Sequence, residues 1–360
     1  VFESQQLGGG RYTVEIRDQL GGSWLPAYEI VSTGVLGGAV RAVSCIMVPE
    51  TFARYQWFVE QGGWKWFQTG ERFEGPVHVN GNLQIDGDPW FGGLVTSGGG
   101  ITLKNNSYPT FARGYQLGVD EVPLPDLSYL ESTVRAAALN GGLYAGPIGG
   151  NGNNKGWYAV ELGEPAPGAL TYTGYKWRNN GTLQTVVPST AVDIAGLNGA
   201  AWFCEDVTIE GILGGQLTIL AEGEVQIWGD ILYDDSTPGS GPDPGCDDVL
   251  GLIADGDIVI SKTAPNMNDC ELHGVFMALE KEILAEKYQQ PPPRGDLIIY
   301  GGLIADKSVH LGQFQLGECT SGYERDYRLD PRLSRMPPPF FPQTGRFIVY
   351  SWQEGVPPEA

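Results

Sequence analysis

The sequence predicts a mainly β fold: a β-solenoid (parallel β-helix) with an inserted β-rich domain and an antiparallel sheet at its N-terminus. Two observations lead to this prediction. The 360 residues include 53 Gly and 25 Pro, which argues against a helical bundle because both residues weaken helices. In addition, a nine-residue pattern of two short strands joined by an acidic or Gly-rich corner recurs along the chain.

Residues 1–70, together with a last strand at 346–352, are predicted to form the antiparallel sheet. Segments 12–16, 28–32 and 37–47 carry alternating or β-branched strand patterns, and Gly-rich turns of hairpin length separate them. An aromatic cluster follows between residues 52 and 67. We expect this cluster to be part of the core and not a ligand platform, because aromatic side chains bury large apolar areas.

Residues 71–104 and 201–320 are predicted to form the β-solenoid. Residues 219–227 (ILAEGEVQI), 252–260 (LIADGDIVI) and 303–311 (LIADKSVHL) align, with a fainter copy at 94–103. Their unequal spacing is typical of a solenoid with loops inserted between its coils. The apolar positions Leu252, Ile258, Leu303 and Val309 should then stack in the interior of adjacent or near-adjacent coils. A β-sandwich with chance similarity is the alternative.

The remaining segments are predicted to lie outside the solenoid, as an inserted domain and a C-terminal wrap. Residues 105–200 would form the inserted β-rich domain, with one short helix over 127–139 that Asp126 or Ser128 caps and Asn140 ends. Residues 321–345 are rich in Pro and Arg. Three consecutive prolines hold an extended segment that can wrap a surface but cannot join a hydrogen-bonded ladder.

The chain is strongly acidic, with 22 Lys+Arg against 43 Asp+Glu and a formal net charge of -21. No basic residue occurs between Arg178 and Lys262. Such a surface repels phosphate at long range, although local fields decide whether DNA binds.

Four arginines near the C-terminus are the candidate DNA contact: Arg325, Arg328, Arg332 and Arg335. The alternative is that they pair with neighbouring carboxylates and fasten the C-terminal wrap. The expected partners are Glu324, Asp326 and Asp330.

Five cysteines without metal-ligand spacing favour an oxidising compartment, outside the cell or in the periplasm. Cys246 and Cys270 flank one repeat unit at a separation of about one coil, so we predict a disulfide between them. The chain begins at Val1 and contains no apolar run long enough to span a membrane. We expect that a signal peptide or an anchoring helix preceded it.

The sequence does not predict an enzyme, a cofactor or a metal site. His78, His273 and His310 are widely spaced, and the carboxylate pairs Asp255/Asp257 and Glu222/Glu224 flank glycine corners. The loop at 233–248 holds five aspartates, but their spacing fits no EF-hand. We expect an ordinary exposed loop there.

Several segments resemble those of a known family. They are GGGRYTVEI (8–16), YEIVSTG (28–34), GGAVR (37–41), GPVHVNG (75–81), GGLVTS (92–97), GY (322–323), DPRL (330–333) and PPPFFP (337–342). In this order they resemble the PilX-like minor pilins of type IV pili that carry a β-solenoid head. The match spans most of the chain but leaves residues 105–200 largely unmatched.

The resemblance implies a cell-surface or pilus protein that an N-terminal hydrophobic helix anchors in the membrane or in the pilus. Other pilins would be its partners, with DNA or a surface polysaccharide as further ligands. The function would be non-enzymatic: adhesion or pilus-tip assembly. A DNA-uptake (competence) receptor and a carbohydrate-active β-helix enzyme are the alternatives.

Overall fold

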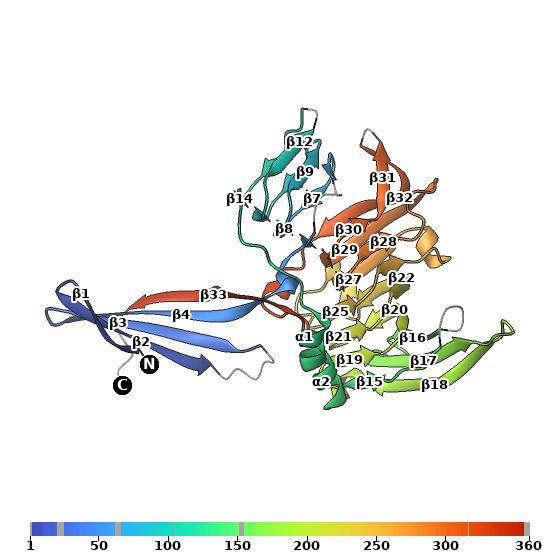
Figure 1. Cartoon of the computed structure of the whole chain (residues 1–360), viewed down its shortest axis with the longest axis horizontal. Coiled ribbons are helices and arrows are strands. Elements are labelled where there is room, and N and C mark those ends of the chain that lie inside the picture. Colours follow the sequence, from blue (N-terminus) through green and yellow to red (C-terminus); the bar gives the residue numbers. More distant parts are fainter. Residues whose placement is uncertain are drawn as a thin grey trace. The chain divides into compact units, whose positions relative to one another are not determined.

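The structure of the protein, a computed structural model, describes residues 2–19, 25–61, 66–104, 106–150, 155–315 and 317–355. The chain is mainly β and divides into two compact units. The first comprises Val1–Thr51 and Gln343–Ala360, and the second comprises Phe52–Pro342. Both ends of the chain belong to the first unit (Figure 1). In the part of the chain that is described, no helix has the length and apolar character needed to cross a membrane.

The first unit is a five-stranded antiparallel sheet. Its strands, in spatial order, are β1 (Phe2–Leu7), β2 (Gly10–Gln19), β3 (Ala27–Leu36), β4 (Ala39–Thr51) and β33 (Gln343–Gly355). Each predicted strand of this region is present, and the C-terminal strand joins the sheet by pairing with β4. Gly37 and Gly38 form the tight turn between β3 and β4 at positive φ, +55° and +85°, which glycine adopts without steric cost.

The second unit consists largely of parallel ladders (Figure 1). The longest contains, in spatial order, β15 (Leu143–Ala145), β19 (Ala200–Phe203), β21 (Gln216–Ala221), β25 (Val249–Ala254), β27 (Cys270–Ala278), β29 (Pro293–Ala305), β5 (Trp57–Val59), β8 (Val77–Val79), β11 (Val95–Ser97) and β14 (Tyr115–Leu117). A second contains β16 (Gly156–Leu162), β20 (Asp206–Leu213), β22 (Val225–Tyr233), β26 (Ile258–Ile260), β28 (Glu282–Ala285) and β30 (Ser308–His310). Two three-stranded parallel ladders contain β6 (Trp66–Gln68), β9 (Leu83–Asp86) and β12 (Ile101–Lys104), and β7 (Arg72–Phe73), β10 (Trp90–Phe91) and β13 (Thr110–Phe111).

The predicted stacking of the repeat units is confirmed. Leu252 pairs with Phe276, which pairs with Leu303, and Ile258 pairs with Ile283, which pairs with Val309. All six side chains are buried in one apolar core. The parallel pairing also excludes an antiparallel sandwich for these strands.

Two predicted boundaries are wrong. The first unit ends at Thr51 and not near residue 70, because β5 pairs in parallel with β29 and β8 of the second unit. The described residues between 106 and 200 belong to the second unit, because β14, β15 and β16 join its parallel ladders. Antiparallel strands β17 (Ala169–Trp177) and β18 (Leu183–Asp193) extend the sheet from β16.

The predicted helix at 127–139 is present. It comprises α1 (Leu127–Leu130), a π-helical turn (Glu131–Arg135) and α2 (Ala136–Leu139). Asp126 is the N-cap, and its carboxylate accepts the N–H of Tyr129 at 2.8 Å.

The smaller elements lie between the ladder strands. They are the 3₁₀ turns Phe52–Arg54, Ile194–Gly196, Pro265–Met267 and Pro331–Ser334, and the strands β23 (Ser236–Thr237), β24 (Gly241–Pro242), β31 (Gly312–Gln315) and β32 (Glu318–Arg328). Strand β32 pairs with β29, so the predicted wrap begins only after Arg328.

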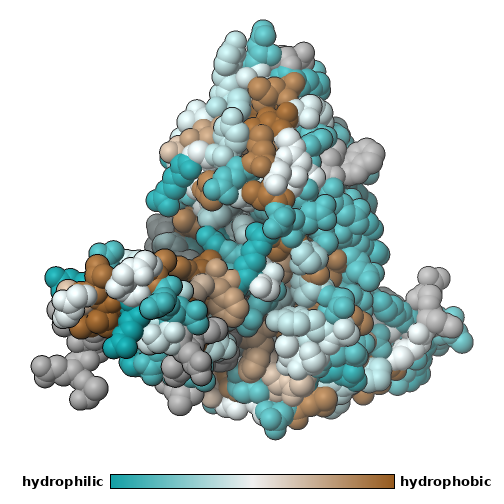
Figure 2. All heavy atoms as spheres, turned by 60° about the vertical axis from the view of Figure 1, so that its left-hand side comes forward, coloured by the Kyte–Doolittle hydropathy of each residue, from teal (hydrophilic) through white to brown (hydrophobic). Residues whose placement is uncertain are grey.

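The aromatic cluster is part of the core, as predicted. Phe52, Trp57, Phe58 and Phe67 are each at most 1% exposed. Trp66 departs from the prediction, because it is only partly buried and lines a surface pocket, and Trp64 lies outside the described residues. Hydrophilic and intermediate residues cover most of the face shown in Figure 2.

The proline segment packs on the sheet and does not join it. Phe341 is buried, and the Oγ1 of Thr218 donates to the carbonyl of Pro339. A Cβ at Gly251 would lie 2.5 Å from Cδ2 of Phe341, so glycine is needed where this segment crosses β25.

Candidate functional site

The candidate DNA contact lies on β32 and in the turn that follows it; we call residues 325–335 the arginine segment. Arg325 pairs with Leu297 of β29, and its side chain is only 7% exposed. Its Nη1 lies 2.9 Å from Oε1 of Glu71, and its guanidinium lies 3.9 Å from the ring centroid of Phe314. Burial opposes the charged form, but the Glu71 carboxylate keeps the pKa of Arg325 above its ordinary value.

Arg328 is fixed by a neighbouring carboxylate and an aromatic ring. Its Nε and Nη2 lie 2.8 and 2.6 Å from Oδ2 of Asp326, and it also donates to the hydroxyl of Tyr300. The guanidinium lies 5.0 Å from the centroid of the Tyr300 ring. The hydrogen bond to Asp326 raises the pKa of Arg328 above its ordinary value.

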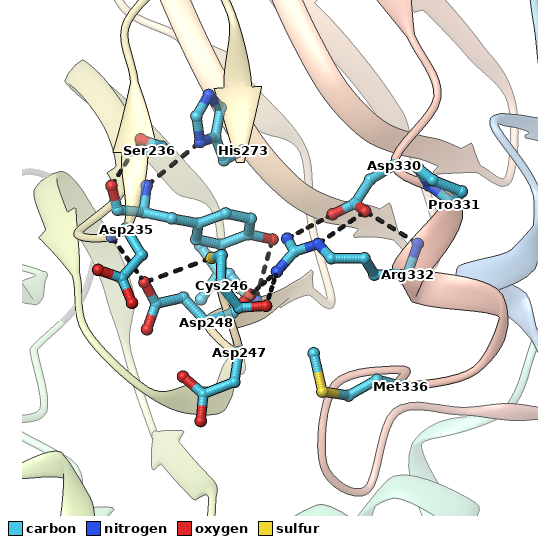
Figure 3. Close-up of polar contacts among 12 residues, drawn as sticks. Asp235, Ser236, Cys246, Asp247, Asp248, His273, Asp330, Pro331, Arg332 and Met336 are labelled. Carbon is cyan, nitrogen blue, oxygen red and sulfur yellow. Dashed lines mark hydrogen bonds and ion pairs between the residues drawn. The ribbon is translucent and has the colours of Figure 1, made fainter. Parts of the chain in front are cut away.

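Arg332 joins the C-terminal turn to the loop before β25 (Figure 3). Asp330 is the N-cap of the turn, and it also accepts two hydrogen bonds from the guanidinium, at 3.0 and 2.7 Å. The Nη1 of Arg332 donates to the carbonyls of Cys246 and Asp248 at 2.8 and 3.2 Å. Such a bidentate pair positions both charges and satisfies the buried carboxylate.

The four predicted arginines therefore do not share one exposed basic patch. Three are held by carboxylates, and the side chain of Arg335 is exposed. Asp326 and Asp330 are partners as the alternative predicted, but Glu71 takes the place expected for Glu324. The Asp-x-Arg spacing is a local sequence signal for the Asp326–Arg328 and Asp330–Arg332 pairs. Glu71 is too far from Arg325 in sequence to give such a signal. This arrangement supports the fastening role over DNA contact.

Of the five aspartates in the 233–248 loop, Asp234, Asp235, Asp243 and Asp247 are exposed, as expected, and Asp248 binds the backbone. Asp248 is buried and accepts the N–H groups of Gly215 and Asp235 at 2.5 and 3.1 Å. Among the described residues, no group of three or more His, Cys, Asp or Glu side chains is placed to hold a metal ion.

The predicted Cys246–Cys270 disulfide is not formed, since all five cysteines are free. Strand β27 changes neighbours at Gly274: Val275–Ala278 pair with β25, whereas Leu272 pairs with Ile231 of β22. Residues 24 positions apart are therefore paired only after Gly274, and this spacing does not apply to Cys270. Cys270 is thus held beside β22, whereas the sulfur of Cys246 lies 3.7 Å from Oδ2 of Asp248.

Two pockets on the described surface of the second unit are considered as candidate binding sites. One, of about 540 Å³, is lined by His310, Phe314 and Arg325, among others, but this arginine is already paired with Glu71. The other, of about 340 Å³, is lined by three tryptophans and several polar side chains; we call it the tryptophan groove. It comprises Trp157, Trp177, Trp228, Lys155, Asp206, Thr208 and Gln226.

The sequence analysis did not identify the tryptophan groove. Its residues come from four strands or their flanks. The parallel pairing of β16, β20 and β22 and the antiparallel pairing of β17 with β16 bring them together. The only local signal is the alternation within residues 219–227, where Gln226 stands between apolar positions that face inward.

The chain was compared with protein families, curated proteins and solved structures. Residues 25–100, well under half of the chain, match a family described as a domain of unknown function (DUF4900). No curated protein matches the sequence. Among solved structures, the chain is similar to the competence-associated pilin ComZ from Thermus thermophilus, with 14% identity, a TM-score of 0.39, and coverage of 98% of this chain and 86% of that chain. This is a distant similarity to a pilin; it establishes neither a common fold nor membership of the PilX-like family.

Proposed function

We propose that the protein is a non-enzymatic, type IV pilus-associated surface protein of the minor pilin kind. The observation that carries the proposal is the division of the chain into two units. The first unit holds both chain ends in one antiparallel sheet, as expected of an attachment module. The second unit is larger and contains the pockets described above.

In this proposal the second unit is a β-solenoid head that displays an adhesive surface. Its parallel ladders bury a continuous apolar core, which leaves outward-facing strand positions available to form a binding surface. The first unit, which contains segments 8–16, 28–34 and 37–41 of the pilin-like signatures, would be the pilin-like sheet.

The two alternatives from the sequence receive less support. DNA contact through the arginine segment would require the side chains that Glu71, Asp326 and Asp330 already hold. For a carbohydrate-active enzyme, one carboxylate of the Glu222/Glu224 pair accepts the indole N–H of Trp202 and the other accepts the amide of Gln226. Both carboxylates thus have structural partners.

Fractionation of pili from the native bacterium tests the proposal. Sheared pili should contain the protein, and in-cell cross-linking should join its first unit to other pilins. A strain that lacks the pilus assembly ATPase serves as control and should lose the protein from the sheared fraction. Absence from the sheared fraction of the wild type, or equal amounts in both strains, would refute the pilus role.

A further inference from the structure

The tryptophan groove lies on the outward face of four adjacent strands, β17, β16, β20 and β22. Side chains of a strand alternate between its two faces. Tyr158, Val207 and Val225 are buried in the core, so their neighbours Trp157, Thr208 and Gln226 face outward. The groove is therefore formed by ladder positions that the core does not use.

Aromatic rings stand at both ends of the groove. At one end, Trp157 lies across from Tyr175, with ring centroids 5.7 Å apart, and 6.0 Å from the ring of Trp177. At the other end is Trp228, on the second strand over from Trp157. Trp228 is offset from Trp157 by two strand spacings across the sheet, roughly 10 Å. Along the strand direction, the register offsets it by four residues, roughly 13 Å.

Polar side chains form the floor between these rings. The Nζ of Lys155 lies 2.7 Å from Oδ1 of Asp206, so the one cation among the described lining residues is neutralised. The amide of Gln226 donates to Oε1 of Glu224 at 2.7 Å and accepts the indole N–H of Trp228 at 3.2 Å. The floor thus offers oriented donors and acceptors without a net positive charge.

We propose that the tryptophan groove binds a neutral oligosaccharide chain. A sugar ring presents a face of C–H groups, which are attracted to the negative face of an aromatic ring, and an edge of hydroxyl groups that both donate and accept. Carboxylate, amide and hydroxyl side chains satisfy such edges. The cavity volume of about 340 Å³ lies in the range of small-ligand sites. The separation of the two aromatic ends suits an extended chain of rings.

The same features disfavour other ligands that stack on aromatic rings. A nucleic acid would need unpaired cations, and the chain carries a net charge of -21. A quaternary ammonium group would need several rings that face one point. The ring of Trp157 is inclined by only 33° to those of Tyr175 and Trp177, so these rings form a row and not a cage.

Binding to the full chain tests this inference. A glycan array should cover neutral α- and β-linked hexose, pentose and N-acetylhexosamine oligomers from di- to hexasaccharides, with choline, a proline-rich peptide and single-stranded DNA as further probes. Hits are then titrated by calorimetry. Trp228→Ala should weaken oligosaccharide binding about tenfold, since it removes one stacking face. Trp352→Ala, an exposed tryptophan of the first unit, should change it by less than about twofold.

Thermal unfolding of each variant shows whether the fold is intact, and Gln226→Leu supplies a second test at the floor, where weaker binding is again expected. The proposal is overturned if no neutral oligosaccharide binds up to millimolar concentration, if choline, peptide or DNA is bound through Trp228 instead, or if both groove variants bind sugar as the wild type does. The inference gives the adhesive part of the proposed function a ligand class. Pilus fractionation and sugar binding can fail independently, so the two failures are distinguishable.

Discussion

The arginine segment and the tryptophan groove use large polar and aromatic side chains in opposite ways. In the arginine segment, Arg325 and Arg332 contact carboxylates and aromatic rings within the fold. In the groove, Trp177 and Trp228 remain 43% and 39% exposed. The comparison teaches that a conspicuous cluster of charges in the sequence marks a structural fastening here. The surface suited to binding comes from outward strand positions that show no cluster in sequence.

A charge placed at an inward ladder position should have the largest effect on stability. Ile258 is fully buried in β26, so Ile258→Asp should cost about 4 kcal/mol or more, because an unpaired charge enters the core. Ile258→Val is the matched control and should cost about 1 kcal/mol. Urea unfolding measures both. A loss below about 1 kcal/mol for the aspartate variant would mean that this ladder does not carry the core.

Within the arginine segment, alanine substitutions at Arg325 and Arg335 should differ clearly in their effect on the free energy of unfolding. Arg325→Ala leaves the buried Glu71 carboxylate without its guanidinium and should cost about 3 to 5 kcal/mol in urea unfolding. Arg335→Ala removes an exposed side chain and should stay within about 0.5 kcal/mol. If the two variants lost equal stability, the fastening role of the segment would be wrong.

The acidic residues beside the groove should give a smaller, pH-dependent effect. Burial, together with the charges of Asp206 and Asp257, raises the pKa of Glu224 in the folded state. The folded chain then holds this proton more tightly than the unfolded chain, so this carboxyl favours folding as the pH falls through its raised pKa and disfavours it as the pH rises.

Glu224→Gln should therefore raise the thermal midpoint slightly at pH 7 and flatten the dependence of stability on pH below 7. Glu318→Gln, at an exposed position, controls for the loss of one negative charge. A lower midpoint at pH 7 for the Glu224 variant, with the control unchanged, would contradict the sign of this effect.

Nucleic acid gives the smallest expected effect. At about 50 mM salt, where phosphate contacts are strong, the full chain should not shift duplex DNA in a gel. DNA binding would contradict the fastening role of the arginine segment. The contradiction would be strongest if replacing Arg325, Arg328 and Arg335 by Ala reduced the slope of log K against log salt concentration by up to about three. The DNA-receptor alternative would then regain its support.

The sequence predicted the parts of the fold that depend on local alternation. Residues 219–227, 252–260 and 303–311 show the inward pattern, and each occupies paired ladder strands in the structure. The strand pair at 275–285 lies between the last two of these segments in the ladders. The sequence pattern missed it because one additional residue separates Phe276 from Ile283. The helix at 127–139 was predicted from its cap and its Asn-Gly ending.

The candidate site could be predicted only in part, because its pairs depend on which strands become neighbours. Arg325 and Glu71 meet through packing between distant segments, which no local spacing encodes. Trp157 reaches Asp206 through the parallel pairing of β16 with β20, across the whole β17–β18 hairpin. The proposed disulfide failed for a related reason, since β27 changes its neighbour at Gly274.

The most direct test of this division between fastening and binding is urea unfolding of Arg332→Ala beside Trp228→Ala. Arg332→Ala leaves Asp330, which is 3% exposed, as an unpaired carboxylate. It should lose about 3 kcal/mol of unfolding free energy. Trp228→Ala should stay within about 1 kcal/mol of the wild type, because the ring lies on the surface. Equal losses, or a larger loss for the tryptophan variant, would contradict the account.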